Sequence, residues 1–168
     1  PKGMYERFVP QVPFISSLFS QWGGTVGDPE NCIKMLQKDE AVIVFPEGAR
    51  GISKSFRKRY ELQRFGLGFM YMALQTKSPI IPVGMVGFEE SMINFGNMDR
   101  VQKLIGFPAA PMLLPFVFPT KVIINIGKPI YFSGDITREY QVQEKVDEVK
   151  AEVKKLMNIG LEQRKSIF

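Results

Sequence analysis

The sequence predicts an α/β fold in which a mostly parallel sheet is flanked by helices on both faces and followed by a long amphipathic helix at the C-terminal end. Apolar segments typical of strands, at residues 41–45, 78–88 and 121–130, alternate with segments of helical periodicity. No linker, repeat or low-complexity segment divides the 168 residues, so we expect residues 1–168 to form a single domain. A chain of this length buries about two thirds of its unfolded surface, which is enough for a core.

Two helices are predicted before the first strand. Residues 14–22 place apolar side chains four residues apart on one face, and Gly23 ends the pattern. Asp28 is expected to cap a second helix over residues 29–40, with Pro29 at its first position. The residues of this second helix that are expected to face inward are Cys32, Ile33 and Leu36.

Two further helices are predicted after the first strand. Residues 65–77 form a mostly apolar helix in which Gly66 and Gly68 allow close packing. Residues 137–164 predict a long helix, and its apolar stripe consists of Val142, Val146, Val149, Val153 and Leu156. We expect this stripe to cover the sheet, because it is too short to favour a coiled coil with a partner.

The net charge and the cysteine count limit the classes of partner. Lys and Arg outnumber Asp and Glu by 22 to 17, so the net charge is +5 and the isoelectric point is about 9.3. This surplus favours nucleic acid, anionic lipid or a phosphorylated substrate. Cys32 is the single cysteine and histidine is absent, so we expect neither a disulfide nor a metal site. No apolar run reaches the roughly 18 residues that a membrane span requires.

The stretch AVIVFPEGARG, residues 41–51, carries an apolar strand directly into charged residues. In α/β sheets, ligands bind beyond the carboxyl ends of the strands, which is where Glu47 and Arg50 emerge. Gly48 lets backbone N–H groups approach a ligand, Arg50 can donate two hydrogen bonds to phosphate, and Glu47 can accept one from a substrate hydroxyl. A simple turn with a solvated ion pair explains the same residues, so both interpretations stay open at this point.

Two motifs carry a resemblance to a known family. FPEGAR, residues 45–50, resembles the third sequence block of the PlsC-type glycerolipid or lysophospholipid acyltransferases, which usually reads Phe-Pro-Glu-Gly-Thr-Arg, with Ala49 in the Thr position. SPIIPVG, residues 78–84, resembles the fourth block, and residues 22–36 lie where the second block is expected. The resemblance extends over residues 12–87.

The resemblance implies acyl transfer from acyl-coenzyme A or acyl carrier protein to a hydroxyl of a glycerol-based lipid, in glycerolipid and phospholipid synthesis. It implies no cofactor, since the acyl thioester is a co-substrate, and it implies peripheral association with the cytoplasmic face of a membrane. In this family the general base is a His followed five residues later by an Asp. Because this chain has no His, that pair is expected upstream of Pro1 and the chain alone is expected to be inactive.

The resemblance also indicates substrate-binding residues. The second block often carries a phosphate-binding Arg, but residues 22–31 contain none. Neighbouring cations can supply that charge to an acceptor phosphate or to coenzyme A, although a solvated basic loop would contain the same residues, Lys58 and Arg64 included. The expected substrate-binding residues are Phe45, Pro46, Glu47, Gly48, Arg50, Lys54, Arg57 and Arg59.

The apolar segment at residues 107–119 is interrupted by four prolines and cannot form one continuous helix. It is expected either to enter a membrane interface or acyl-chain groove, or to be a buried connection. The residues of interest are Phe107, Leu113, Leu114 and Phe116.

Two functions compete with acyl transfer. A non-catalytic lipid- or phosphate-binding module would keep the site without the chemistry, and a His and Asp encoded upstream would argue against it. Nucleic-acid binding is disfavoured, because no aromatic residues accompany the basic loop as a stacking platform.

Overall fold

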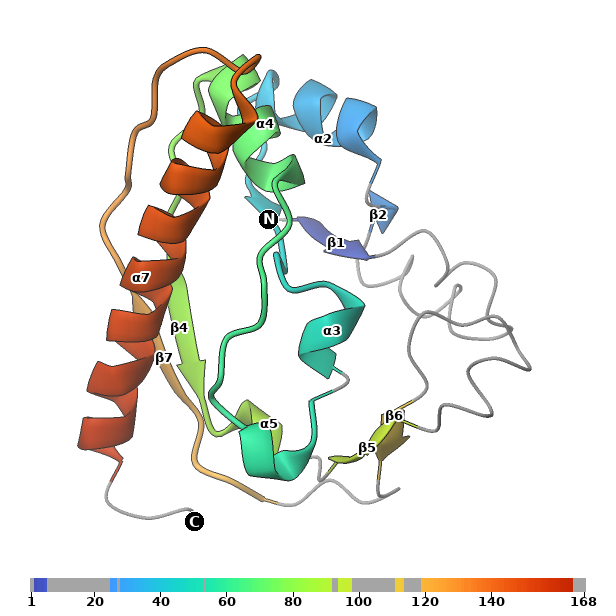
Figure 1. The fold of residues 1–168 in the computed structure, drawn as a ribbon, viewed down its shortest axis with the longest axis vertical. Coiled ribbons are helices and arrows are strands. Elements are labelled where there is room, and N and C mark those ends of the chain that lie inside the picture. Colours follow the sequence, from blue (N-terminus) through green and yellow to red (C-terminus); the bar gives the residue numbers. More distant parts are fainter. Residues whose placement is uncertain are drawn as a thin grey trace.

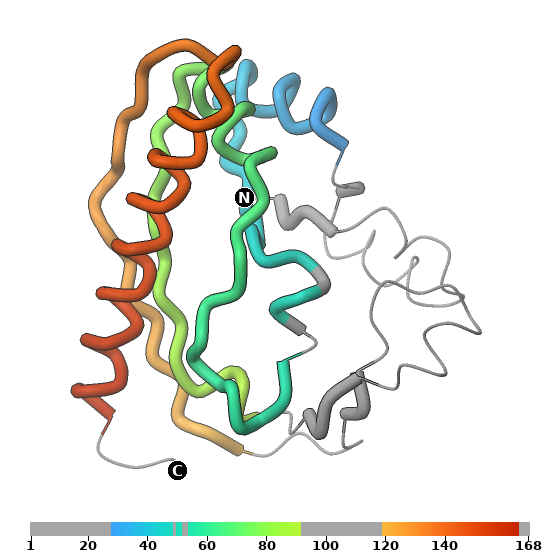
Figure 2. Tube along the Cα trace, viewed as in Figure 1, coloured from blue at the N-terminus to red at the C-terminus, as the bar shows by residue number. Residues whose placement is uncertain are grey.

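The computed structural model describes residues 2–5, 25–26, 28–52, 54–91, 94–97, 111–113 and 119–164 (Figures 1 and 2). The helix predicted at residues 14–22 lies outside these ranges. The described elements are β1 (Lys2–Tyr5), β2 (Thr25–Val26), α2 (Pro29–Leu36), β3 (Val42–Ile43), α3 (Ala49–Ile52), η2 (Phe56–Lys58), α4 (Gly68–Thr76), β4 (Val83–Val86), α5 (Phe88–Ser91), β5 (Asn94–Asn97), β6 (Pro111–Leu113), β7 (Ile123–Ile126) and α7 (Glu139–Gln163).

The described strands form parallel and antiparallel pairs. Strand β1 lies between β2 and β3 and is parallel to both. Strands β4 and β7 pair antiparallel, and so do β5 and β6. The expectation of a mostly parallel sheet is therefore wrong for β4 and β7. An apolar run predicts a strand but not its direction, which depends on the path of the chain between the strands.

The two faces of the β4–β7 pair have different environments. Val86 is fully buried on the face toward α7, and Gly84 is buried on the same face. On the other face Val83 lies opposite Ile126, and Met85 lies opposite Ile124. This second face is called the outer face here, and its exposed apolar residues are Ile81, Val83, Met85, Val122, Ile124 and Ile126. Helices were expected on both faces of the sheet. Among the described residues, a helix covers one face of the β4–β7 pair, and the outer face is exposed.

Helix α7 lies along β4 and β7 (Figure 1) and approaches them closely. A Cβ atom on Gly84 would lie 2.7 Å from the Leu156 Cβ and 2.7 Å from the Met157 backbone nitrogen. Across the same contact, the Asn125 Nδ2 donates a hydrogen bond of 2.9 Å to the Leu156 carbonyl. The absence of a side chain at Gly84 therefore sets the distance between helix and strand.

The core lies between α4 and α7. Its buried residues are Phe65, Met70, Leu74, Val142, Val146 and Val149. The predicted stripe of α7 is confirmed, since three of its valines are buried here and Val153 packs against them. Helix α4 is shorter than predicted and ends at Lys77, which has the left-handed φ of 54° typical of a helix C-terminus.

Helix α2 starts where the sequence indicates, with Asp28 at the N-cap and Pro29 in the first turn, although the Asp28 side chain makes no capping hydrogen bond. The inward position of Cys32 is confirmed, and Met35 is also buried. Ile33 and Leu36 are partly buried.

We predict that Gly84→Ala destabilises the fold and that Gly68→Ala does not. The added methyl at Gly84 would meet the backbone of α7, and overpacking of this kind costs about 1–3 kcal/mol. Gly68 has no atom within 4 Å of an added Cβ and lies in a helix, where Ala is favoured by up to about 1 kcal/mol. Urea unfolding of both variants is the measurement, and equal stability of the two would contradict the packing described for Gly84.

Candidate functional site at the Pro-Glu-Gly turn

The predicted site is a turn, Pro46 to Gly48, that leads from β3 into the short helix α3. Gly48 has a φ of 58°, a left-handed conformation that glycine adopts without steric cost. Its N–H donates to the Phe45 carbonyl at 3.0 Å, and the Gly66 N–H donates to the Pro46 carbonyl at 2.8 Å. The Phe45 side chain is 59% exposed. The turn is thus joined to the segment before α4, and Phe45 faces outward.

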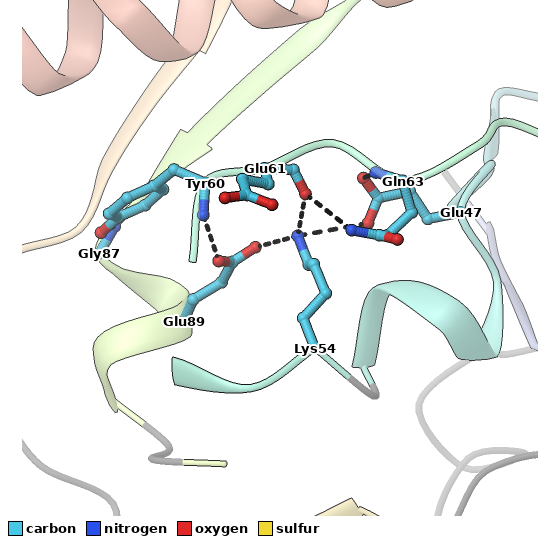
Figure 3. Close-up of polar contacts among 7 residues, drawn as sticks. All are labelled: Glu47, Lys54, Tyr60, Glu61, Gln63, Gly87 and Glu89. Atoms are coloured by element: carbon cyan, nitrogen blue, oxygen red, sulfur yellow. Dashed lines mark hydrogen bonds and ion pairs between the residues drawn. The ribbon is translucent and has the colours of Figure 1, made fainter. Parts of the chain in front are cut away.

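Both carboxylate oxygens of Glu47 have partners within the protein. The Gln63 backbone N–H donates to Oε1 at 2.8 Å, and the Lys54 Nζ lies 3.5 Å from Oε2 (Figure 3). A Cβ on Gly51 would lie 2.6 Å from Oε2, so the small residue there leaves room for the carboxylate. The Glu47 side chain is 15% exposed. The prediction that it accepts a substrate hydroxyl stays a prediction, and this geometry favours support of the turn.

The predicted cations have two kinds of environment. Arg50 and Arg57 are exposed and make no ion pair with any described residue, as is also true of Lys58 and Arg64. The Lys54 side chain, in contrast, is 6% exposed and pairs with carboxylates. Arg59 pairs with Glu90, and its guanidinium lies 4.7 Å from the centre of the Phe56 ring. The exposed members are therefore the ones available to an anionic ligand.

A second group of charged residues, absent from the sequence prediction, lies on α5. The Glu89 Oε1 accepts from the Lys54 Nζ at 2.7 Å, and its Oε2 accepts from the Tyr60 N–H at 2.6 Å. Tyr60 has a φ of 66°, which is unfavourable for a residue with a bulky side chain. Glu89 thus holds Tyr60 in this conformation and links α5 to the candidate site.

Glu90 is 7% exposed and lies between two arginines. Its Oε2 forms an ion pair with the Arg164 Nη1, and its Oε1 lies 3.4 Å from the Arg59 Nε. The Tyr60 hydroxyl accepts from the Gly87 N–H and from the Arg164 Nη1, both at 3.0 Å. These contacts attach the C-terminal end of α7 to α5.

A sequence signal for this second group was present. FEES follows an apolar strand directly, as PEGAR does, so the same rule about carboxyl ends of strands applies to Glu89 and Glu90. Their pairing with Lys54 and Arg164 carries no such signal, because these residues are 35 and 74 positions away in the sequence, by subtraction of their numbers. The partners became evident only from the fold.

Cys32 is unsuited to nucleophilic chemistry. It is 2% exposed, its Sγ lies 3.1 Å from the Asp28 carbonyl oxygen as a hydrogen-bond donor, and burial raises the pKa of its thiol. Within the described ranges, no group of His, Cys, Asp and Glu has the arrangement of a metal site. None of the described helices has the length and apolar character needed to cross a membrane.

The predicted apolar segment is described only in part. Leu113 belongs to β6, where it pairs with Asn94. Phe107, Leu114 and Phe116 lie outside the described residues. The expected membrane or acyl-chain contacts of this segment stay predictions.

Comparison with known proteins defines the class. The family model described as Acyltransferase matches residues 5–86, which extend from the last residue of β1 to the end of β4 and include the Pro-Glu-Gly turn. This match confirms the resemblance to the acyltransferases that was drawn from the motifs. The fold resembles the crystal structure of the 1-acyl-sn-glycerophosphate acyltransferase PlsC from Thermotoga maritima, with a TM-score of 0.62, 19% identity and coverage of 98% of this chain and 58% of that one.

The chain is also similar to longer proteins. It is 32% identical to an uncharacterized protein of Mycobacterium tuberculosis, covering 94% of this chain and 48% of the relative. A human protein named DGAT1/2-independent enzyme synthesizing storage lipids is 26% identical, covering 92% of this chain and 48% of that protein. The chain thus spans about half the length of the curated relatives it matches.

We predict that Tyr60 makes stability sensitive to alkaline pH. Burial is the main cause that raises the pKa of its phenol above the usual 10.0, and the nearby Glu90 carboxylate adds to the rise. A raised folded-state pKa means that the stabilisation is complete below about pH 10 and is lost as the pH rises through the folded pKa. Between about pH 9 and 11, the Tyr60→Phe variant should therefore lose less stability than the wild-type chain. It should be less stable at neutral pH by about 1–3 kcal/mol, because the Gly87 N–H loses its acceptor.

Urea unfolding at several pH values is the measurement. The matched control is Tyr131→Phe, because Tyr131 is 75% exposed. Identical pH dependence of Tyr60→Phe and the wild-type chain would contradict the assignment to Tyr60.

Proposed function

We propose that this chain carries the acceptor-binding part of an enzyme that transfers an acyl group from acyl-coenzyme A or acyl carrier protein to a hydroxyl of a glycerol-based lipid. The observation that carries the proposal is the Pro-Glu-Gly turn, held by hydrogen bonds at the end of β3, with the exposed Arg50 directly after it. The match to the acyltransferase family model supports it. The names of the human storage-lipid enzyme and of the Thermotoga acyltransferase support a glyceride or lysophospholipid as acceptor.

The reaction is direct transfer between donor and acceptor. The acceptor hydroxyl loses its proton to a general base while its oxygen attacks the thioester carbonyl. A C–O bond forms, the C–S bond breaks, and the departing thiolate takes up a proton. The inaccessible thiol of Cys32 supports a route without an acyl-enzyme intermediate. Since the chain has no His, the family's His-Asp base is proposed to come from outside these 168 residues.

Arg50 is the proposed contact for an anionic group of the acceptor. Its guanidinium can donate two parallel hydrogen bonds to a phosphate, and it has no ion-pair partner to give up among the described residues. Arg57 is exposed on the same segment and is proposed to add to the positive potential felt by the acceptor phosphate or by coenzyme A.

We predict that Arg50→Ala weakens acceptor binding selectively. Loss of one charge-assisted contact costs roughly 1.5–3 kcal/mol, which is about one to two powers of ten in the dissociation constant. Calorimetric titration with lysophosphatidate, monoacylglycerol and acyl-coenzyme A is the measurement, with Lys38→Ala as an exposed control outside the turn. We expect lysophosphatidate binding to fall for Arg50→Ala alone and acyl-coenzyme A binding to stay nearly constant.

Thiol release from acyl-coenzyme A completes the experiment. We expect no acceptor-dependent turnover by the 168-residue chain, because it lacks the base. Turnover well above background would overturn the assignment of the base. The contrary result is that the wild-type chain binds both acceptors and that a normally folded Arg50→Ala variant binds them equally well. That result would show that the turn is structural only.

We further propose that the chain binds the surface of an anionic membrane peripherally, as expected for the cytoplasmic face of a bilayer. The supporting observation is the outer face of β4 and β7, where Ile126 is 72% and Ile124 is 55% exposed. Exposed Lys121 and Lys128 lie just beyond the two ends of β7, so apolar contact and positive charge occur together. The net charge of +5 has the same sign.

Vesicle co-sedimentation tests this proposal. Wild-type chain should sediment with phosphatidylserine-containing vesicles, less with neutral ones, and less at high salt because the charge is then screened. The double variant Ile124→Ser, Ile126→Ser should lose at least half of the bound fraction, an order-of-magnitude expectation from about 1 kcal/mol per buried CH₂. Ile136→Ser is the control, since Ile136 is 44% exposed outside the strand pair. Sedimentation of the double variant like the wild-type chain would exclude the outer face as the contact.

A further inference from the structure

Lys54 lies at the centre of a polar network that the function proposed above does not use. Its Nζ donates to the Glu89 Oε1 at 2.7 Å and to the Glu61 carbonyl at 3.0 Å, and it lies 3.5 Å from the Glu47 Oε2 (Figure 3). The side chain is 6% exposed, so almost none of its charge is solvated by water. The three oxygens therefore replace the hydration shell of this ammonium.

The network joins three separate backbone segments. Glu47 belongs to the Pro-Glu-Gly turn, Glu89 belongs to α5, and Glu61 lies in the segment before α4 (Figure 3). The two carboxylates extend the connection, because Glu47 accepts from the Gln63 N–H and Glu89 accepts from the Tyr60 N–H. Lys54 thus connects the candidate site to α5 and to the chain between η2 and α4.

The charges make Lys54 a requirement for this arrangement. Glu47 and Glu89 both direct an oxygen to the same Nζ, and their side chains are 15% and 33% exposed. Without the cation between them, two partly buried carboxylates would repel each other and one backbone carbonyl would lose its donor. Movement of Glu47 away from Glu89 would then release the turn from the Gln63 N–H.

The consequence for Arg50 follows from the size of its helix. Helix α3 contains four residues, Ala49–Ile52, which is too short to be stable by itself. Its position depends on contacts outside it, and Glu47 precedes Arg50 by three residues, by their numbers. A turn held at Glu47 presents Arg50 in one place, whereas a loosened turn presents it in many.

We propose that Lys54 is a positioning residue, which fixes the Pro-Glu-Gly turn through Glu47 and Glu89 so that Arg50 meets the acceptor in a defined orientation. The role of Arg50 in this statement rests on the proposed function, whereas the hold on the turn does not. Lys54 itself does not contact substrate. The sequence prediction of direct substrate binding by Lys54 is replaced, in this proposal, by an indirect role.

Amide hydrogen exchange tests the hold on the turn. The Lys54→Met variant keeps the length of the side chain and removes its charge. The amides of Gly48, Gly51, Gln63 and Gly66, which donate hydrogen bonds in and around the turn, should exchange faster by about one to two powers of ten, the effect of one lost charge-assisted hydrogen bond. Amides of α7 should be unchanged, because the helix packs elsewhere. Lys38→Met, which changes an exposed lysine outside the turn, is the matched control and should exchange like the wild-type chain.

Acceptor titration and a conservative variant separate positioning from general stability. Lysophosphatidate binding should weaken about tenfold in Lys54→Met and remain unchanged in Lys38→Met, with acyl-coenzyme A binding equal in both. Lys54→Arg keeps the charge and should recover most of the slow exchange and most of the affinity. Should Lys54→Met fail to fold, Glu89→Gln removes one partner while keeping its shape, and the same local acceleration is expected.

Each outcome has one meaning. Local exchange in Lys54→Met and in Glu89→Gln that matches the wild-type chain would overturn the proposal, and so would equal acceleration in Lys38→Met. Faster exchange with unchanged lysophosphatidate affinity, where Arg50→Ala does lose affinity, would overturn the link to Arg50. If the wild-type chain binds no acceptor, the proposed function fails, and the exchange measurement still decides whether Lys54 holds the turn.

Discussion

The close contact of helix α7 with strand β4 at Gly84 is the constraint on which the rest of the described structure depends. A side chain at Gly84 would overlap the backbone nitrogen of Met157, so the helix reaches the strand only because this residue is a glycine. The contact buries one face of the β4–β7 pair and places Val146 in the core beside Met70. It also brings the residue after the helix, Arg164, to the buried Glu90.

From this contact a chain of charge pairs extends toward the Pro-Glu-Gly turn. Arg164 pairs with Glu90 on α5, Glu89 on the same short helix pairs with Lys54, and Lys54 pairs with Glu47 in the turn. Buried charges are tolerated when each is paired and hydrogen-bonded, and the two pairs of Lys54 meet that condition, with backbone groups as additional partners of Lys54, Glu89 and Glu47. Both oxygens of the Glu47 carboxylate in the turn therefore have a partner.

This arrangement separates the cations of the basic segment into two groups. Lys54 and Arg59 are engaged by carboxylates of the fold, whereas Arg50 and Arg57 face solvent without such partners among the described residues. The sequence shows all of them as equivalent members of one basic loop. A ligand phosphate could approach Arg50 and Arg57 without competition from a described carboxylate, whereas Lys54 and Arg59 already have carboxylate partners.

Helices α2, α4 and α7, strands β3, β4 and β7 and the Pro-Glu-Gly turn could be predicted from consecutive residues. The stripe of α7 and the change from an apolar strand to charged residues after residue 45 are local patterns. Such patterns can be recognised because they involve residues that are close together in the sequence. The antiparallel pairing of β4 with β7 and the partners of Lys54 became evident from the fold alone. Strand direction depends on the path of the chain between strands, and the Lys54–Glu89 pair joins residues that are distant in sequence. Neither the strand direction nor the ion pair produces a periodic pattern in the sequence. For the ion pair, many basic and acidic residues could be partners until packing brings two of them together.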